Sequence, residues 1–419
     1  MTQRPSDEIE YPRLRPLELF PARVDGQQVL CLRDPTHLAE SVISVSRQAA
    51  VIIGLFDGRH SLLDIQEAHA RRFGALLFRE QLLGLIHSLD EHLLLDSPRF
   101  ARHLETLETT FREAATRPAQ LAGRAYPADP QELRTQLDGF FGAIDGPGGT
   151  PPSPEAAQLA GLVVPHIDFQ RGGPCYAWGY REAAGAPTPD RWVILGTVHA
   201  PIARPFALTR KSFQTPLGTA DTDREFMDSL LARVGERYLD DEFAHRGEHS
   251  IEFLCVLLRH LVPGPLRIVP VLCGSLHEAV EAGRSPGRGD VAEFLAALRE
   301  TSAEQGGRTV FVASADLAHV GPQFGDEDRI TPEVLRVVET ADREMLARAE
   351  AGDADGFFQA VARDGDRRRI CGLPPIYAML RLLEGSHGRL LRYGQWPDPN
   401  GTVTFAALAL YESAASREP

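Results

Sequence analysis

Short, continuous apolar runs alternate with amphipathic segments along most of the chain beyond residue 150. The apolar runs are residues 161–165, 192–196, 267–272, 311–315 and 402–410. The amphipathic segments are residues 223–234, 248–261, 291–300, 332–350 and 374–385. Such alternation is typical of βαβ units, and strands without polar positions belong in a sheet covered on both faces. We therefore predict an α/β fold with a mostly parallel central sheet and helices on both faces.

Residues 1–103 have a different pattern, which predicts a separate small domain of winged-helix type. Three helices are expected at 42–58, 61–73 and 79–92, with a hairpin at 24–35 and a wing strand at 93–100. Ser61 can cap the second helix and Gly74 can end it. Residues 104–117 predict a helical linker, so the α/β domain is expected at 118–415.

The charge of the first domain argues against DNA binding, which many winged helices carry out through basic helices. Residues 1–115 hold 13 arginines against 17 acidic residues, a net charge of −4. In layout the domain is similar to PqqD-type peptide-recognition domains, which bind a peptide by adding a strand. A packing or dimerisation module is the other interpretation.

The whole chain is acidic, with 419 residues, 43% hydrophobic and 24% charged positions, and a formal charge of −14. This charge disfavours nucleic-acid or anionic-membrane partners, which need clustered positive charge. No run reaches the roughly 18–20 apolar residues of a membrane span, and the N-terminus lacks the apolar core of a signal peptide. The five cysteines are scattered, which indicates a reducing compartment. We expect a cytoplasmic protein without a membrane partner.

Ionisable residues follow three of the predicted strands. His166 comes directly after the first strand, His199 after the second, and Asp316 and His319 after the fourth. In open α/β sheets ligands bind beyond the carboxyl ends of the strands, so these side chains are expected to share a site. Asp316 and His319 would lie on one face of a helical turn and could form an acid/base pair.

Two further residues are candidates for the same site. His249, with Glu252 three residues later, begins a strongly apolar helix. Cys371 lies in a Cys-Gly turn before another helix, and a thiol at a helix N-terminus tends to be deprotonated and available as a ligand. Taken singly, His249 could be a helix-terminal histidine bonded to backbone, and Cys371 an inert packing residue.

Together the motifs of the larger domain resemble the signature blocks of the Memo family. In order, they are VVPHIDFQRGGPCYAWGY, ILGTVH, FALTRKSFQTPLGTADTD, EHSIEF, RIVPVLCG, FVASADLAHVG and ICGLPPI, spread over about residues 116–415. The family is similar in fold to the class III extradiol dioxygenases. Bacterial members are often labelled AmmeMemoRadiSam system protein B, beside an AMMECR-like protein and a radical SAM protein, which makes these two candidate partners.

The resemblance implies a metal site. His166, His199 and Cys371 correspond to the metal-coordinating residues of the family, and His249, Asp316 and His319 to the neighbouring groups expected to serve catalysis. Asp168 and Arg171 fall where this sequence departs from animal members, so they are candidates for contacts to the ligands or substrate.

Two imidazoles and a thiolate favour one transition metal ion, with iron or copper ahead of zinc. Three protein ligands leave a coordination position open, as catalytic sites do. One interpretation is a dioxygenase-like oxidoreductase acting on a small molecule or a modified peptide. The other is a non-catalytic metal- or peptide-binding adaptor in a radical-SAM-associated modification pathway. A homodimer fits the apolar helix faces.

Overall fold

The structure, a computed structural model, describes residues 9–24, 27–36, 38–39 and 41–412. By contact the chain divides into two compact units, Met1–Glu113 and Ala114–Pro419. Each unit has hydrophobic clusters of its own, so each is described separately.

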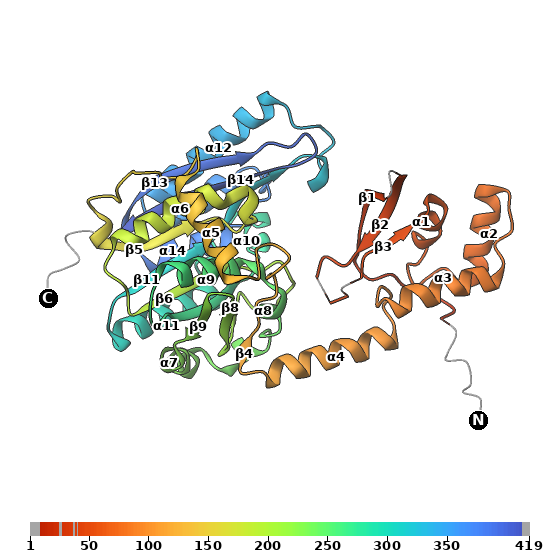
Figure 1. The fold of residues 1–419 in the computed structure, drawn as a ribbon, viewed down its shortest axis with the longest axis horizontal. Coiled ribbons are helices and arrows are strands. Elements are labelled where there is room, and N and C mark those ends of the chain that lie inside the picture. Colours follow the sequence, from red (N-terminus) through yellow and green to blue (C-terminus); the bar gives the residue numbers. More distant parts are fainter. Residues whose placement is uncertain (1–8, 25–26, 37, 40, 413–419) are drawn as a thin grey trace. The chain divides into compact units, whose positions relative to one another are not determined.

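The first unit combines a small antiparallel sheet with four helices (Figure 1). The strands, in the order β1-β2-β3, are β1 (Glu18–Val24), β2 (Gln27–Arg33) and β3 (Ile43–Val45). The helices are α1 (Arg47–Ile53), α2 (Leu62–Phe73), α3 (Arg79–Glu91) and α4 (Pro98–Glu113). The predicted second and third helices are confirmed. β1 and β2 pair as a hairpin, but it begins at Glu18, six residues before the predicted range of 24–35. Ser61 and Asp64 form a reciprocal capping box at the start of α2, and Gly74 ends it with φ +63°.

Two predictions for the first unit are wrong. Residues 42–58 do not form one helix, because 43–45 pair with β2 and Ser46 caps a shorter α1 at its N-terminus. Residues 93–100 are not a wing strand: Leu95 makes one isolated bridge to Leu14, and α4 begins at Pro98. The linker expected to be helical over 104–117 is helical only to Glu113, as the second half of α4 in the first unit, and Thr116–Arg117 form β4 of the second unit.

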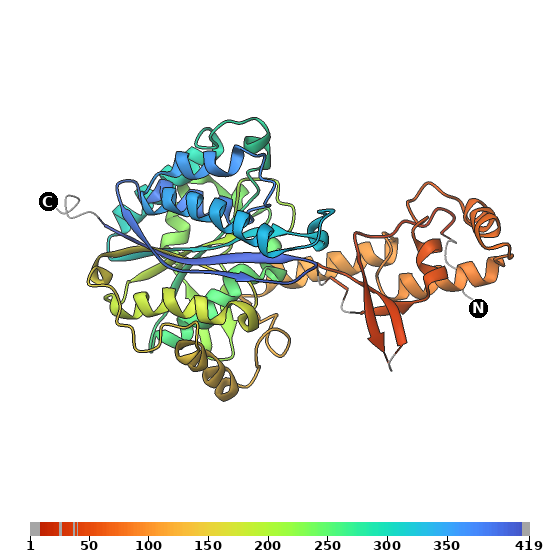
Figure 2. The same ribbon diagram turned by 90° about the horizontal axis from the view of Figure 1, so that it is seen from above.

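The second unit is built on one eleven-stranded sheet (Figure 2). Its main path runs β12-β14-β5-β11-β6-β10-β9-β8-β4, with β13 pairing β14 and β7 pairing β10. The four inner strands β5, β11, β6 and β10 are mutually parallel, whereas β12, β13 and β14 form an antiparallel margin. The bounds are β4 (Thr116–Arg117), β5 (Leu159–Val164), β6 (Arg191–Thr197), β7 (Phe206–Leu208), β8 (Ser212–Thr215), β9 (Gly218–Thr222), β10 (Arg267–Cys273), β11 (Thr309–Ser314), β12 (Asp316–Val320), β13 (His387–Trp396) and β14 (Thr402–Tyr411).

Helices cover both faces of this sheet, as the continuous apolar strands predicted. Within β6, Trp192 and Ile194 pack into one hydrophobic cluster, and Val193 and Leu195 into the other. The first cluster includes residues of α5 (Pro130–Gly142), α6 (Phe169–Gly185) and α9 (His249–Leu261). The second includes residues of α7 (Arg224–Val234), α10 (His277–Glu281), α11 (Asp290–Gln305), α12 (Pro332–Glu350), α13 (Ala354–Ala362) and α14 (Leu373–Leu382). The short α8 (Ala244–Gly247) precedes α9.

All five predicted strands and the five predicted helices of this unit are present. The predicted helical turn at Asp316 and His319 is wrong, because both residues lie in β12, which pairs β14 with an irregularity between them. Glu252, three residues after His249, does not join the candidate site. Glu252 is buried away from His249, where its carboxylate binds Arg117, the Tyr126 hydroxyl and the backbone N–H of Leu121.

Candidate metal centre

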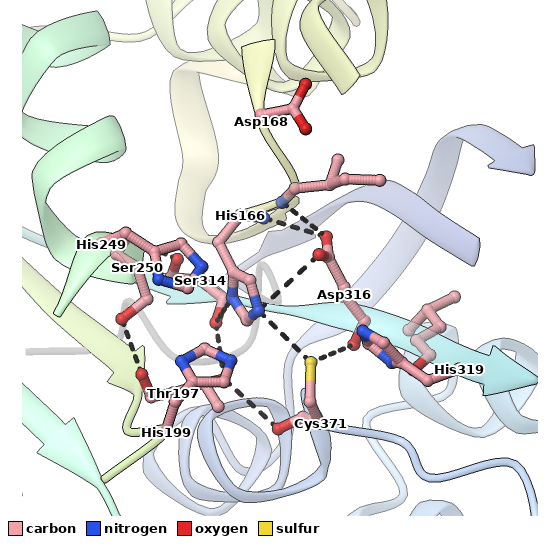
Figure 3. A network of polar contacts seen from close by, with 12 residues as sticks. His166, Asp168, Thr197, His199, His249, Ser250, Ser314, Asp316, His319 and Cys371 are labelled. Atoms are coloured by element: carbon pink, nitrogen blue, oxygen red, sulfur yellow. Dashed lines mark hydrogen bonds and ion pairs between the residues drawn. The ribbon is translucent and has the colours of Figure 1, made fainter. Parts of the chain in front are cut away.

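The candidate residues gather at the carboxyl end of the inner strands (Figure 3). His166 follows β5 and His199 follows β6, each after one intervening residue. Asp316 begins β12 just beyond β11, His249 begins α9, and Cys371 lies two residues before α14. Strand ends and helix N-termini therefore meet at one place, as expected for an α/β sheet.

Three potential ligand atoms face one another. His166 is 2% exposed, and its Nδ1 donates a hydrogen bond to the Ser314 carbonyl at 3.1 Å. This contact leaves the Nε2 lone pair free, and Nε2 lies 3.3 Å from Cys371 Sγ. One nitrogen of His199 completes the group, whose ligand atoms all lie within 4.8 Å of one another. The structure thus brings together His166, His199 and Cys371 in a geometry that can hold a metal ion.

Glu248 fixes the orientation of His199. Its buried carboxylate accepts the His199 backbone N–H at 2.9 Å and contacts His199 Nδ1 at 3.1 Å. With Nδ1 occupied, Nε2 of His199 is free to coordinate, which is a common arrangement around metal-bound imidazoles. Burial alone would raise the pKa of Glu248, but His199 and His249 hold it well below its usual value. Glu248 in turn raises the pKa of His199 against the effect of burial.

Glu248 is the residue that sequence reasoning missed. It also accepts the backbone N–H groups of His249 and Ser250 and so caps α9. Its sequence signal is weak, because helix N-caps are usually Ser, Thr, Asn or Asp and not Glu. The contact of Glu248 with His199 could not be predicted from the sequence, because the two residues are far apart along the chain.

Asp316 supports the loop that carries His166. Its Oδ1 accepts the backbone N–H groups of His166 and Ile167 at 3.0 and 3.1 Å, and Oδ2 lies 3.7 Å from His166 Nε2. Burial raises the pKa of Asp316. The carboxyl group therefore both positions the first histidine and sits beside its free nitrogen.

His249 and His319 lie on opposite sides of the group (Figure 3). The His249 ring stacks on His199 with centroids 4.7 Å apart, and burial lowers its pKa to about 4. His319 donates from Nδ1 to the Leu317 carbonyl at 3.1 Å, and its ring packs edge-on against Phe324. His249 directly contacts the cluster, whereas His319 neighbours it beside Asp316.

The turn that carries Cys371 packs tightly against β12. The Gly372 N–H donates to the Asp316 carbonyl, and a Cβ at Gly372 would lie 2.4 Å from that oxygen, so only glycine fits. Burial raises the pKa of the Cys371 thiol well above its usual value. Burial thus acts against the lowering effect expected of the nearby helix N-terminus.

A pocket of about 510 Å³ opens beside His199 and Cys371. Most of its wall is apolar, from Val198, Cys273, Leu276, Val280, Ile370, Leu373 and Pro374. Its volume is in the range of small-molecule sites. The group of potential ligands therefore borders a space in which a substrate-sized molecule fits.

Asp168 and Arg171 have a helix-capping role in the structure. Asp168 accepts the backbone N–H of Arg171 at 3.1 Å and pairs with its Nε at 2.6 Å at the start of α6. In Figure 3 the Asp168 carboxylate points away from Cys371 and His199. Neither residue lines the pocket beside Cys371.

The second unit is similar in sequence to proteins of a known family. Residues 117–406 match the family described as Memo-like protein. A MEMO1 family protein of Methanopyrus kandleri is 32% identical over 69% of this chain and 96% of its own length. One from Thermus thermophilus is 31% identical over 80% of this chain and 94% of its own.

A third relative also bears on the first unit. A MEMO1 family protein of Aquifex aeolicus is 26% identical over 385 residues, 91% of this chain and 95% of its own length. The alignment is longer than Ala114–Pro419 and so extends into the first unit. Among the described residues, no helix combines the length and the apolar character that crossing a membrane requires.

Proposed function

Since the chain belongs to the Memo family, we propose that its second unit is a metal-dependent oxidoreductase of dioxygenase-like type. In this proposal His166, His199 and Cys371 hold one transition metal ion. The main support for this proposal is that the three ligand atoms lie within 4.8 Å of one another, beside a pocket of about 510 Å³.

The donor set fits a metal ion. Both ring Nδ1 atoms are already engaged, His166 with the Ser314 carbonyl and His199 with Glu248. Nε2 is therefore the nitrogen that each imidazole has available for a metal ion, and in His166 it lies 3.3 Å from Cys371 Sγ. A soft thiolate with two imidazoles suits copper or iron, and we favour these over zinc. A bound ion of this kind would supply redox chemistry and Lewis acidity at an open position.

The surrounding residues have separate tasks in this proposal. His249 is neutral at physiological pH because burial lowers its pKa to about 4, so its ring can accept a proton from a bound substrate. Asp316 holds the His166 loop and, with a pKa raised by burial, can take part in proton transfer beside Nε2. His319 influences Asp316 electrostatically and is assigned to the same proton path.

Metal analysis tests the proposal. The protein and a Cys371→Ala variant are purified without oxygen, and their metal content and metal-dependent O₂ consumption are measured. We expect close to one iron or copper ion per chain in the wild type and a large loss in the variant. Wild-type metal content at the background of Cys371→Ala would refute the site. Metal retention without O₂ consumption across a panel of amines and peptides would favour a binding role.

A non-catalytic adaptor role has one observation in its favour. Seven of the ten exposed large hydrophobic side chains among the described residues lie in the first unit, among them Leu63, Leu76 and Phe78. A peptide or a partner protein could cover exposed apolar side chains of this kind, and radical SAM and AMMECR-like proteins are the proposed partners. We further propose a cytoplasmic location, since all five cysteines are free thiols. Co-purification of tagged full-length protein from its native cells tests the partner assignment.

A further inference from the structure

Apart from the potential metal ligands His199 and Cys371, the pocket has one charged side chain without an ion pair among the described residues. Its polar lining includes Arg369, His277, Ser275, Thr197 and Asp366. Arg369 binds Asp326 through Nη2 at 2.6 Å and the His319 carbonyl through Nη1. His277 pairs with Glu281 at 3.1 Å. The hydroxyl groups are also engaged: Thr197 donates to the Ser314 carbonyl, and Ser275 accepts the His277 N–H.

Asp366 differs from these residues. Its Oδ1 accepts the backbone N–H of Ile370 at 2.8 Å. For Oδ2, no hydrogen bond or ion pair to any described residue is found. The side chain is half-buried, and burial raises its pKa. A carboxylate oxygen in a mostly apolar pocket, without a protein donor, is short of a hydrogen-bonding partner.

The backbone holds Asp366 in place. Its φ is +54°, and its N–H donates to the Val361 carbonyl while its own carbonyl accepts the N–H of Arg369. Arg368 and His277 are close enough to lower the pKa of Asp366, but among the described residues neither forms an ion pair with it. Arg368 is buried against Asp342, Arg369 is paired with Asp326, and the exposed Arg367 is not part of the wall. The pocket therefore has a mostly apolar body and one carboxylate that forms no ion pair with any described residue.

We propose that this pocket binds a small molecule with an apolar body and a primary ammonium group, and that Asp366 Oδ2 receives the ammonium. The assignment rests on the proposed function only in placing the substrate beside the metal. The ammonium gains a charge-assisted hydrogen bond in a low-dielectric environment, whereas a neutral or anionic head group of the same shape gains less or is repelled. Asp366 is thus a specificity-determining residue of this site.

The test compares three probes of nearly equal shape: phenethylamine, 2-phenylethanol and phenylacetate. Each is titrated into the purified full-length protein at pH 7.5 by calorimetry, for wild type, Asp366→Asn and Asp364→Asn. Asparagine can still accept the Ile370 N–H and tolerates a positive φ. Asp364 is an exposed carboxylate outside the pocket wall, so its variant removes the same charge from the same loop.

We expect the amine to bind the wild type and Asp364→Asn about tenfold or more tightly than the alcohol, in line with one charged hydrogen bond. Asp366→Asn should abolish this preference. The assignment is overturned if the amine does not bind at millimolar concentration, if alcohol and amine bind equally, or if Asp366→Asn keeps the preference.

Metal content is measured on the same samples. A wild type that lacks metal but keeps the Asp366-dependent preference would refute the proposed function and leave the amine site standing. Unchanged metal content in Asp366→Asn shows that the variant acts on the pocket and not on the ligands.

Discussion

Glu248 has more hydrogen-bonding partners than any ligand it supports. It accepts three backbone N–H groups and lies within 3.2 Å of the Nδ1 atoms of His199 and His249. In Glu248→Gln one oxygen becomes an NH₂ group facing these donors, so His199 loses its fixed orientation. We expect metal affinity to fall about 10–100-fold, measured by competition with a chelator. Glu281→Gln, a change at an exposed carboxylate, should leave affinity unchanged; equal affinities in both variants would contradict this role.

We predict that stability depends on pH through the buried side chain of His245. It is 1% exposed, its Nε2 donates to the Ala207 carbonyl, Nδ1 has no partner among the described residues, and burial lowers its pKa to about 3. In the unfolded chain its pKa is near 6.5. Between these pH values the unfolded state binds one more proton than the folded state. The contribution of neutral His245 to the free energy of unfolding is therefore complete above pH 6.5 and is lost as the pH falls toward 3.

The variant His245→Gln keeps a donor for Ala207 and removes the titration. The free energy of unfolding, measured in urea from pH 7 to pH 4.5, should decline less steeply in the variant. The difference in slope should approach about 1.4 kcal/mol per pH unit below pH 6. Identical slopes would show that His245 is not the neutral buried group described above.

At the scale of elements, the loop before α14 is held by a buried ion pair. Arg368, in the turn that leads to Cys371, binds Asp342 of α12, which also accepts hydroxyl hydrogen bonds from Thr404 and Tyr393. In Asp342→Asn the Arg368 charge stays buried without a counter-charge, so the free energy of unfolding should drop by about 3–5 kcal/mol.

A matched control lies on the same helix. Glu339→Gln breaks the exposed Glu339–Arg343 pair of α12 and should cost less than about 1 kcal/mol. Urea denaturation of both variants makes the comparison. Similar small losses in both would mean that the buried pair does not anchor the Cys371 loop.

The same elements show what sequence could predict. The inner strands and His166 and His199 followed from apolar runs and the strand-end rule. β13 was not predicted, because its positions are mostly half-buried and many are polar. α6 was missed because it contains Pro174 and several glycines; at Gly179 a Cβ would lie 2.5 Å from Val164, so close packing against β5 explains the residue type. Cys371 and Glu248 depend on contacts distant in sequence, which local patterns do not encode.

For the whole molecule, the separate cores predict that the second unit folds without the first. Residues 114–419 should retain the metal content and melting temperature of the full chain. A shorter truncation, residues 119–419, lacks Arg117. The fully buried side chain of Arg117 binds Glu252 and the carbonyl groups of His245 and Glu248. Breaking this buried pair should cost about 3–5 kcal/mol. Thermal melting and metal analysis of both truncations test the boundary. Equal melting temperatures and metal contents would contradict a boundary before Arg117.

The position of β14 in the sheet determines when the second unit can complete its fold during synthesis. Leu408 of β14 lies against Val163 of β5, and Phe405 lies opposite Asp316. While a ribosome is still adding the residues between, β5 and β12 have no neighbour on this side, and the His166 loop is supported only in part. Contacts so distant in sequence form late. The nascent chain can therefore reach a metal-competent shape only after β14 has left the exit tunnel.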